Sequence, residues 1–143
     1  MILIFGGTTE GRTAVKVLDE AGSPYYYSTR GNAQQIECKH GTRVAGGMDH
    51  DAMMEFCSTH DICLIIDAAH PFASLLHTTV AAVSEQLDLP VIRLERRYPP
   101  RDESLVWCDT FDDAIDYLES HEIRDLLALS GVQTITKLQR YWE

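Results

Sequence analysis

The stretch Ile2-Leu3-Ile4-Phe5-Gly6-Gly7-Thr8-Thr9-Glu10-Gly11-Arg12 decides the fold class. Its first four residues are apolar, as in a central parallel strand that is buried on both faces. Two glycines end the strand, and an amphipathic helix follows, with Gly22 as its stop. The expected buried face of this helix is Ala14, Val17, Leu18 and Ala21. A buried strand that leads through glycines into a helix predicts a parallel α/β sheet.

Strand and helix patterns alternate along the rest of the chain. Further strands are predicted at 24–27, 43–45, 62–66 and 90–92. Two helices between them carry apolar faces, and Asp49 is expected to cap the first of the two. These faces are Met53, Met54 and Cys57, and then Leu76, Val80, Val83 and Leu87. The alternation predicts a Rossmann-like, doubly wound parallel sheet in a three-layer αβα arrangement.

The segment 97–102 contains two prolines and no periodicity, so it is predicted to be a linker or covering loop. A helix is expected around Phe111, Ile115 and Leu118. The apolar run at 126–129 then predicts a new strand that ends in Ser130-Gly131. We therefore expect a Rossmann-like NADPH-binding domain at 1–125 and the start of a second, truncated α/β domain at 126–143. On this interpretation the chain holds the first of two domains.

The bulk composition narrows the class of partner. Twelve Lys and Arg face 22 Asp and Glu, which gives a formal net charge of −10 and argues against nucleic acid as a partner. No apolar run approaches the roughly 20 residues that a membrane span needs, and no secretory signal pattern follows Met1. We therefore expect a cytoplasmic protein without membrane contact. The oligomeric state is not predicted beyond a monomer or a weak dimer.

The four cysteines are expected to be reduced thiols, because the chain has no export signal pattern. Cys57, His60 and Cys63 lie close enough in sequence to suggest a metal site. Cys63 falls in a predicted buried strand, however, and no fourth ligand lies nearby. We therefore predict no metal.

The turn after the first strand is expected to hold phosphate groups, because a helix N-terminus presents unpaired N–H groups and the positive end of its dipole. Gly6 permits the tight turn, and Thr8 and Thr9 add hydroxyl donors. Thr8 replaces the middle glycine of the usual dinucleotide fingerprint, and an ordinary tight turn is the alternative. The predicted phosphate-binding residues are Gly6, Gly7, Thr8, Thr9, Glu10, Gly11 and Arg12.

The end of the second predicted strand indicates which nucleotide binds. NAD-binding domains usually carry an acid there, whereas this chain has Ser28-Thr29-Arg30. A guanidinium beside two hydroxyls suits a 2′-phosphate, which favours NADPH over NADH. The alternative is that Arg30 is a solvated loop residue.

Polar residues follow the fourth and fifth predicted strands, at the edge where open α/β sheets bind ligands. Asp67 and His70 lie in the run Asp67-Ala68-Ala69-His70-Pro71-Phe72-Ala73. His70 could donate a proton near neutral pH. A helix cap for Asp67 and a backbone-satisfied loop residue for His70 are equally good alternatives.

A basic cluster ends the fifth predicted strand: Arg93, Arg96, Arg97 and Arg101. These side chains could clamp the carboxylates of a substrate. The alternative is a solvated loop in which Glu95 pairs locally.

Three motifs in this order resemble the precorrin-6A reductase family of cobalamin biosynthesis. They are residues 2–12, residues 67–73 and Arg93-Leu94-Glu95-Arg96, and Leu129-Ser130-Gly131 resembles the start of the family's second domain. Two departures stand out. Ala69 replaces a threonine that is common in the family, and Arg97-Tyr98 separate Arg96 from the prolines.

The resemblance implies an NADPH-dependent reduction of one double bond in a carboxylate-rich tetrapyrrole, precorrin-6A or its cobalt complex. It places Asp67, Ala68, His70, Pro71 and Phe72 on the nicotinamide side of a cleft, with Asp67 and His70 as catalytic candidates. Arg93 and Arg96, with Ser130 and Gly131, would then bind the substrate.

Two other functions remain open at this point. The first is another NADP-dependent Rossmann reductase or epimerase, although the Tyr-x-x-x-Lys pair typical of the extended kind does not occur. The second is a nucleotide-sensing domain without catalysis.

Overall fold

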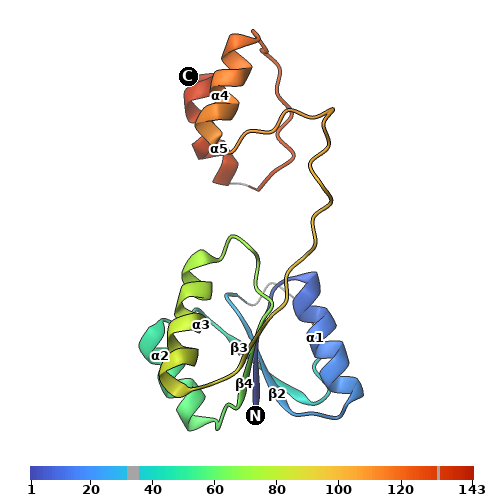
Figure 1. Ribbon diagram of the computed structural model, residues 1–143, viewed down its shortest axis with the longest axis vertical. Helices are drawn as coiled ribbons and strands as arrows, with labels where there is room; N and C mark the ends of the chain where they lie inside the picture. Colours follow the sequence, from blue (N-terminus) through green and yellow to red (C-terminus); the bar gives the residue numbers. More distant parts are fainter. Residues whose placement is uncertain (32–35, 132) are drawn as a thin grey trace. The chain divides into compact units, whose positions relative to one another are not determined.

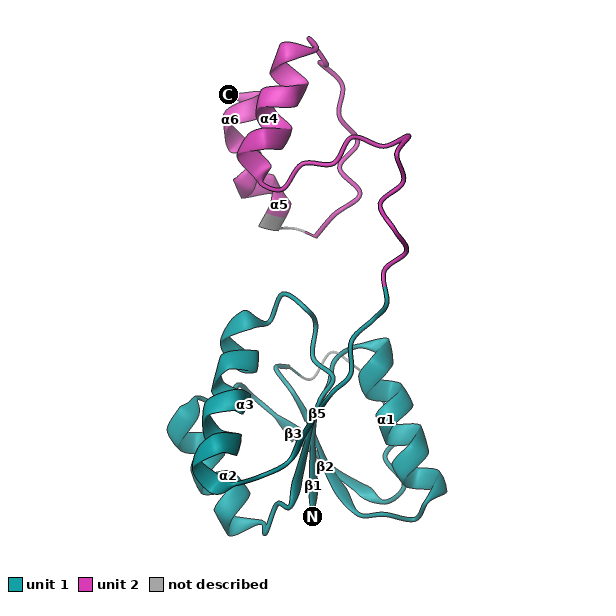
Figure 2. Ribbon diagram, in the orientation of Figure 1, with its two compact units in different colours: residues 1–97 teal, residues 98–143 magenta. Residues whose placement is uncertain are grey.

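The computed structural model describes residues 1–31, 36–131 and 133–143, with no account of the Gln133 side chain. The chain forms two compact units, Met1–Arg97 and Tyr98–Glu143 (Figure 2). The predicted division after residue 125 differs from this boundary. The reason is that helix α4 (Phe111–Ser120) packs against α6 (Gln139–Trp142) within the second unit. The proline-containing segment at 97–102 therefore lies at the junction.

The first unit is built on a five-stranded parallel sheet, as predicted. Its strand order is β3-β2-β1-β4-β5, so the first strand along the chain lies at the centre. The strands are β1 (Ile2–Phe5), β2 (Tyr25–Thr29), β3 (Gly41–Ala45), β4 (Leu64–Asp67) and β5 (Val91–Arg93).

Helices cover both faces of the sheet and complete the three layers. Figure 1 shows α1 (Thr9–Glu20) on one face and both α2 (His50–Thr59) and α3 (Ser74–Leu87) on the other. Alternating residues of β1 divide the core between these faces. Leu3 and Phe5 pack with residues of α2 and α3, whereas Ile4 packs with residues of α1. All three side chains are at most 3% exposed, as a central strand requires.

The predicted faces of α2 and α3 are confirmed, and the predicted face of α1 is partly wrong. In α2, the Asp49 side chain caps the helix through the Ala52 N–H. In α1, Val17 is 56% exposed and Ala21 is also exposed. The helix instead meets the sheet along Gly11, Ala14, Val15 and Leu18. The close approach of Gly11 to the sheet turns this face inward.

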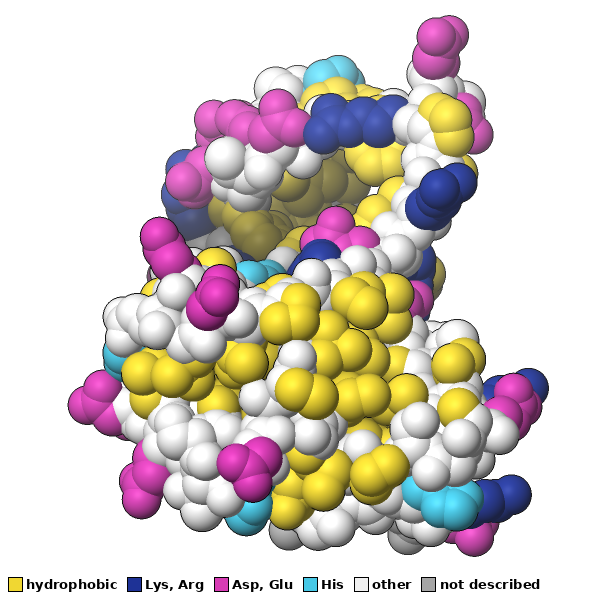
Figure 3. Space-filling model, turned by 60° about the horizontal axis from the view of Figure 1, so that its bottom comes forward, with side chains coloured by type: hydrophobic (Ala, Val, Ile, Leu, Met, Phe, Trp, Pro, Cys, Tyr) yellow, Lys and Arg dark blue, Asp and Glu magenta, His cyan; other side chains and the backbone are white. Residues whose placement is uncertain are grey.

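The β5 edge of the sheet is only partly covered. Val91 and Ile92 are 38% and 46% exposed, because β5 lies at the end of the sheet, next to β4. Figure 3 shows hydrophobic side chains spread over one face of the first unit, with acidic side chains around them.

The second unit is helical where it has regular structure. A capping box formed by Thr110 and Asp113 begins α4, and α5 (Gln133–Lys137) and α6 follow. The predicted strand at 126–129 is wrong, because no described residue of this unit pairs with that run. Leu127 and Leu129 are 80% and 88% exposed, and an apolar run becomes a strand only where neighbouring residues pair with it. No helix in the described ranges is both long and apolar enough to span a membrane.

Candidate functional site

The carboxyl ends of four strands bring the predicted site residues of the first unit to one edge of the sheet. In the ladder, Phe5 lies opposite both Ser28 and Asp67, and Asp67 lies opposite Arg93. Backbone hydrogen bonds continue past the strand ends, from Gly6 N to Ser28 O and from Ala68 N to Phe5 O, both at 2.9 Å. The glycine loop, the end of β2, the loop after β4 and the end of β5 are therefore neighbours. This is the edge at which open α/β sheets bind ligands.

The glycine loop is built over the ring of Tyr27. Tyr27 is fully buried, and its hydroxyl oxygen accepts a hydrogen bond from Gly7 N at 3.0 Å. A Cβ atom on Gly6 would lie 2.3–2.4 Å from the Tyr27 ring, and one on Gly11 would lie 2.9 Å from Gly6 Cα. Burial raises the pKa of Tyr27, so the hydroxyl stays protonated. The glycines are thus required by the packing beneath the loop.

Sequence reasoning missed the role of Tyr27. The sequence predicts only a strand at 24–27. In the sheet, Tyr27 lies next to Ser28, which is opposite Phe5, the residue just before the glycine turn. A large aromatic residue opposite a pair of glycines is the signal that could have identified it.

The two loop positions after Gly6 differ in what they offer a ligand. Gly7 has φ +96° and a Cβ there would meet nothing within 4 Å, so this part of the loop is open. The Thr8 hydroxyl, by contrast, accepts from Gly11 N at 3.0 Å and donates to Ala68 O at 2.5 Å. The predicted hydroxyl donor of Thr8 is therefore engaged in capping α1 and in joining the glycine loop to the loop after β4.

The Arg96 guanidinium, predicted to contact substrate, bonds to Glu10 of the glycine loop. The Arg96 Nε lies 3.1 Å from the Glu10 carboxylate. The Arg96 hydrogen bond, helped by the Glu10 backbone N–H, holds the pKa of Glu10 below its ordinary value. This acid stands in the first turn of α1, where an anion is favoured by the helix dipole.

We predict that Arg96→Ala raises the pKa of Glu10 toward the ordinary value near 4.5. A carboxyl group whose pKa is lowered in the folded state stabilises the fold above its unfolded pKa. That contribution disappears as the pH falls through the lowered value. We therefore expect the free energy of unfolding of Arg96→Ala to fall less than that of the wild type between neutral and acidic pH. A carbon-13 NMR titration of the Glu10 carboxyl group measures the change. Arg97→Ala is the control, and an unchanged Glu10 titration in Arg96→Ala would contradict the pairing.

The side chains at the end of β2 are less accessible than predicted. Ser28 and Thr29 are 3% and 6% exposed, and the Thr29 hydroxyl donates to Gly31 O at 2.9 Å. Arg30 is exposed. Of the three residues predicted to bind the 2′-phosphate, Arg30 is the one whose side chain is accessible to a ligand.

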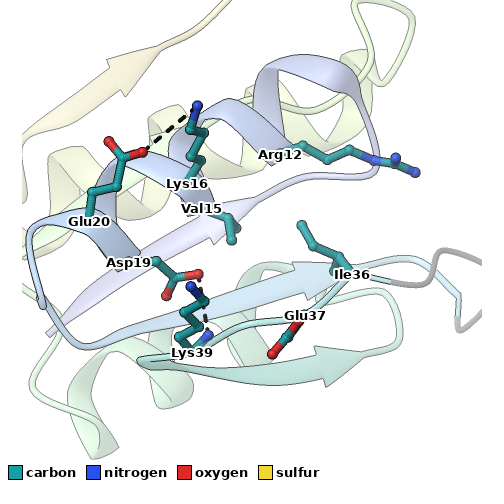
Figure 4. Close-up of a pocket in the computed structure, with 8 residues that line it drawn as sticks. All are labelled: Arg12, Val15, Lys16, Asp19, Glu20, Ile36, Glu37 and Lys39. Atoms are coloured by element: carbon teal, nitrogen blue, oxygen red, sulfur yellow. Dashed lines mark hydrogen bonds and ion pairs between the residues drawn. The ribbon is translucent and has the colours of Figure 1, made fainter.

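Arg12 also lines a pocket of about 360 Å³ between α1 and residues 36–39. Figure 4 shows the Arg12 side chain pointing toward the N-terminal end of α1, away from Glu20. Acidic and basic side chains line this pocket together, which does not favour a phosphate group in the pocket itself. The lining residues are Arg12, Val15, Lys16, Asp19, Glu20, Ile36, Glu37 and Lys39.

Asp67 is the buried centre of a charged cluster at the ends of β4 and β5. It is 2% exposed, and its two carboxylate oxygens lie 2.8 Å from Arg93 Nη1 and 2.7 Å from His77 Nδ1. Arg93 Nη1 in turn lies 2.7 Å from His77 Nδ1, and the Arg93 guanidinium also bonds to Glu95. Burial opposes the positive charge of Arg93, but the bonds to Glu95 and Asp67 outweigh it and raise the pKa of Arg93.

These contacts change the expected roles of two residues. Arg93 was expected to clamp substrate carboxylates, whereas two acids of the chain already neutralise it. The alternative in which Glu95 pairs locally is thus realised for Arg93. Asp67 was a candidate catalytic group, and its carboxylate is enclosed by its own partners. It also accepts from Ala69 N at 3.3 Å, which shapes the loop that follows.

His70 is exposed at the tip of this loop, next to Phe72. Its Nδ1 accepts from Phe72 N at 3.2 Å, so the proton of a neutral ring lies on Nε2. The rings of His70 and Phe72 lie 5.0 Å apart, and Phe72 is 87% exposed. An accessible N–H donor and an exposed aromatic face therefore stand together at the carboxyl edge.

His77, in the first turn of α3, is a second residue that sequence reasoning missed. Its Nδ1 faces Asp67, and its Nε2 lies 3.1 Å from the carbonyl oxygen of His70. The available signal was its position seven residues after His70, in the first turn of a helix that begins beside the sheet edge. That signal is weak without knowledge of where the helix lies.

The remaining predicted site residues belong to the second unit or have other partners. Ser130 and Gly131 are exposed in the second unit, in a segment without regular structure. Arg101 bonds to Asp109 there. Cys57 is in the core, and His60 Nδ1 lies 3.0 Å from the Tyr26 hydroxyl. Within the described ranges, no three His, Cys, Asp or Glu side chains are grouped to hold a metal ion.

Comparison with known proteins supplies the family. The family model described as precorrin-6x reductase CbiJ/CobK matches residues 1–143. The chain belongs to this family. Among curated members, a cobalt-precorrin-6A reductase of Synechocystis is 31% identical over 69% of this chain. A precorrin-6A reductase of Rhodococcus erythropolis is 30% identical over 99% of it.

A solved structure, CobK precorrin-6A reductase, shares the fold with a TM-score of 0.67. It is 24% identical in sequence, and the match covers 80% of this chain and 46% of that one. The matches to the two curated relatives span 38% and 59% of their lengths. This chain of the CbiJ/CobK family therefore corresponds to part of its longer relatives.

Proposed function

We propose that this chain is the NADPH-binding part of a reductase that acts on a macrocycle double bond of precorrin-6A or cobalt-precorrin-6A. The observation that carries the proposal is the open glycine loop at the carboxyl end of β1, in a chain that belongs to the precorrin-6x reductase family. The relatives named above act on those two substrates by their printed names.

The donor set at the edge fits a phosphorylated dinucleotide. Gly7 leaves room for close approach, and the N-terminus of α1 offers N–H groups to the phosphates. Arg30, exposed just after β2, suits a 2′-phosphate. Residues 28–30 also lack the acid that NAD-binding domains usually carry at this position. We assign the phosphates to Gly6–Arg12 and the adenosine end to 28–30, where the backbone and Arg30 supply the contacts.

When bound, NADPH would supply a hydride, and the protein would supply position and electrostatics. We assign the nicotinamide side to the loop 67–72. His70 is our candidate proton donor in its imidazolium form, which gives up the proton of the accessible Nε2 and returns to the neutral ring; in the neutral ring Nδ1 accepts from Phe72 N. We assign the buried Asp67 a positioning role, because its carboxylate accepts from Ala69 N and contacts His77. If His70→Ala kept full turnover at unchanged NADPH affinity, the donor role would be refuted.

The substrate's carboxylates require cations, and the structure favours Arg96 over Arg93 for this role. The Arg96 side chain is 55% exposed, whereas the Arg93 side chain is 27% exposed and is held by the buried Asp67. Ser130 and Gly131 remain proposed substrate contacts on the basis of the family resemblance.

We predict that Arg30→Ala weakens NADPH binding about tenfold and leaves NADH binding unchanged, because a charge-assisted contact to the 2′-phosphate is lost. Fluorescence titration of the chain with each nucleotide measures both affinities. Lys16→Ala is the control, because it also removes one positive charge, from a side chain of α1 that is 75% exposed. Equal losses for both nucleotides in Arg30→Ala would refute the 2′-phosphate role.

The reaction itself is tested in the whole protein that contains this chain, by NADPH oxidation in the presence of precorrin-6A and of its cobalt complex. The proposal expects a reduced macrocycle with one NADPH consumed per product. NADPH binding without reduction of either substrate would reject the reductase assignment for this chain and leave a nucleotide-binding unit.

A further inference from the structure

We propose that His77 is a positioning residue that holds the His70–Phe72 loop in the geometry needed for proton donation. The catalytic part of this inference rests on the proposed function. The positioning part rests on contacts within the first unit alone.

The loop needs an anchor because its tip is exposed. His70 and Phe72 are both exposed, and the loop's earlier attachments end at Ala68 and Ala69. From His70 onward the loop bonds mainly to its own turn, through Phe72 N to His70 Nδ1 and Ala73 N to His70 O. Bonds within the turn give it shape but do not attach it to the sheet.

His77 provides that attachment. Its Nε2 donates to His70 O at 3.1 Å, since a carbonyl oxygen can only accept. Its Nδ1 lies 2.7 Å from the buried Asp67 carboxylate, at the end of β4. With a proton on Nδ1, the ring donates to Asp67 directly; without it, Nδ1 accepts from Arg93 Nη1, which itself lies 2.8 Å from Asp67. In either form the ring connects the tip of the loop to a carboxylate that is 2% exposed.

The groups around this ring explain why it is held in one orientation. Asp67 comes from β4, Arg93 from β5 and Glu95 from the segment after it, and the His70 carbonyl lies on the opposite side of the ring. The His77 side chain is 22% exposed. Rotation of the ring would break the contacts to Asp67, Arg93 and His70 at once. A side chain with a single polar end could contact either the Asp67–Arg93 pair or the His70 carbonyl, but not both.

Three substitutions separate the two ends of the ring. His77→Ala removes both contacts. His77→Gln keeps an N–H donor near the place of Nε2, and His77→Asn keeps a polar group near the place of Nδ1. Thr78→Ala, on the next residue of α3 and exposed, is the matched control.

The primary readout is amide hydrogen exchange at Phe72 and Ala73 in the whole chain, with no substrate or cofactor present. We expect exchange about tenfold faster in His77→Ala and in His77→Asn, and close to the wild-type rate in His77→Gln and Thr78→Ala. The nitrogen-15 signals of the His70 ring should also lose their single-tautomer pattern in His77→Ala. If His77→Ala does not fold, the comparison of Gln with Asn carries the test alone.

The proposal is overturned if His77→Ala exchanges at the wild-type rate, or if Asn restores protection as well as Gln does. Turnover is the second readout. The expected result for His77→Ala is a tenfold lower kcat with an unchanged Kd for NADPH. If the whole wild-type protein that contains this chain reduces no precorrin while the loop still depends on His77, the proposed function fails and the positioning role stands.

Discussion

Gly6→Ala is expected to destabilise the first unit by about 3 kcal/mol, near the upper end of what overpacking costs. The new Cβ would lie 2.3–2.4 Å from Cε2, Cζ and the hydroxyl oxygen of Tyr27, a ring that is fully buried and cannot move aside cheaply. Urea denaturation followed by circular dichroism measures the loss. Gly47→Ala is the matched control, because a Cβ there meets nothing within 4 Å, and we expect a change within about 0.5 kcal/mol.

A double-mutant cycle shows whether the Tyr27 ring is the cause. Tyr27→Leu removes the three atoms that the new methyl group would meet. In that background we expect Gly6→Ala to cost about 1 kcal/mol or less, which gives a coupling of about 2 kcal/mol. Additive losses would mean that the cost arises elsewhere in the turn. Because Tyr27 also accepts the Gly7 N–H bond, the same cycle reports how far the shape of the glycine loop depends on β2.

Asp67→Asn is expected to destabilise the chain by about 2–4 kcal/mol. Asparagine keeps the size of the side chain, but it leaves the Arg93 guanidinium and His77 without their central carboxylate. Removal of one partner of a buried ion pair costs about 3–5 kcal/mol, and the partial exposure of Arg93 reduces this figure. Thermal and urea unfolding of the variant measure the loss.

Asp109→Asn is the matched control, because Asp109 also pairs with an arginine, Arg101, but is 78% exposed. Exposed pairs contribute about 0–1 kcal/mol, so this variant should be close to wild type. Equal losses in the two variants would show that burial of Asp67 is not what gives its ion pairs their importance.

Local patterns predicted the layers of the first unit well. The apolar run 2–5 followed by glycines predicted β1 and α1, and alternation along the chain predicted the parallel sheet. Such patterns are reliable because burial on a strand or a helix requires a fixed spacing of apolar residues. The predictions failed where burial depended on distant partners. Val17 had the right spacing but faces outward, and the run at 126–129 found no strand to pair with.

The candidate site was predicted in its location but not in its internal bonding. Because parallel strands end at one edge, residues after four strands could be placed together without knowledge of the side chains. The partners of Arg93 and Glu10 could not be predicted. They depend on which strands are neighbours in space and on the path of the chain after β5, through contacts separated by 26 and 86 residues.

The amino-acid sequence by itself determined the α/β class, the glycine-containing turn into the first helix at Gly6–Arg12, and the edge of the sheet at which a ligand is expected. These follow from local spacing and from the chemistry of glycines at a helix start. Only the tertiary structure decided which polar groups are still free at that edge. It placed Tyr27 beneath the loop, enclosed Asp67 between Arg93 and His77, and left His70 and Arg30 exposed. Such pairings arise from the packing of distant segments, which the order of residues along the chain does not reveal.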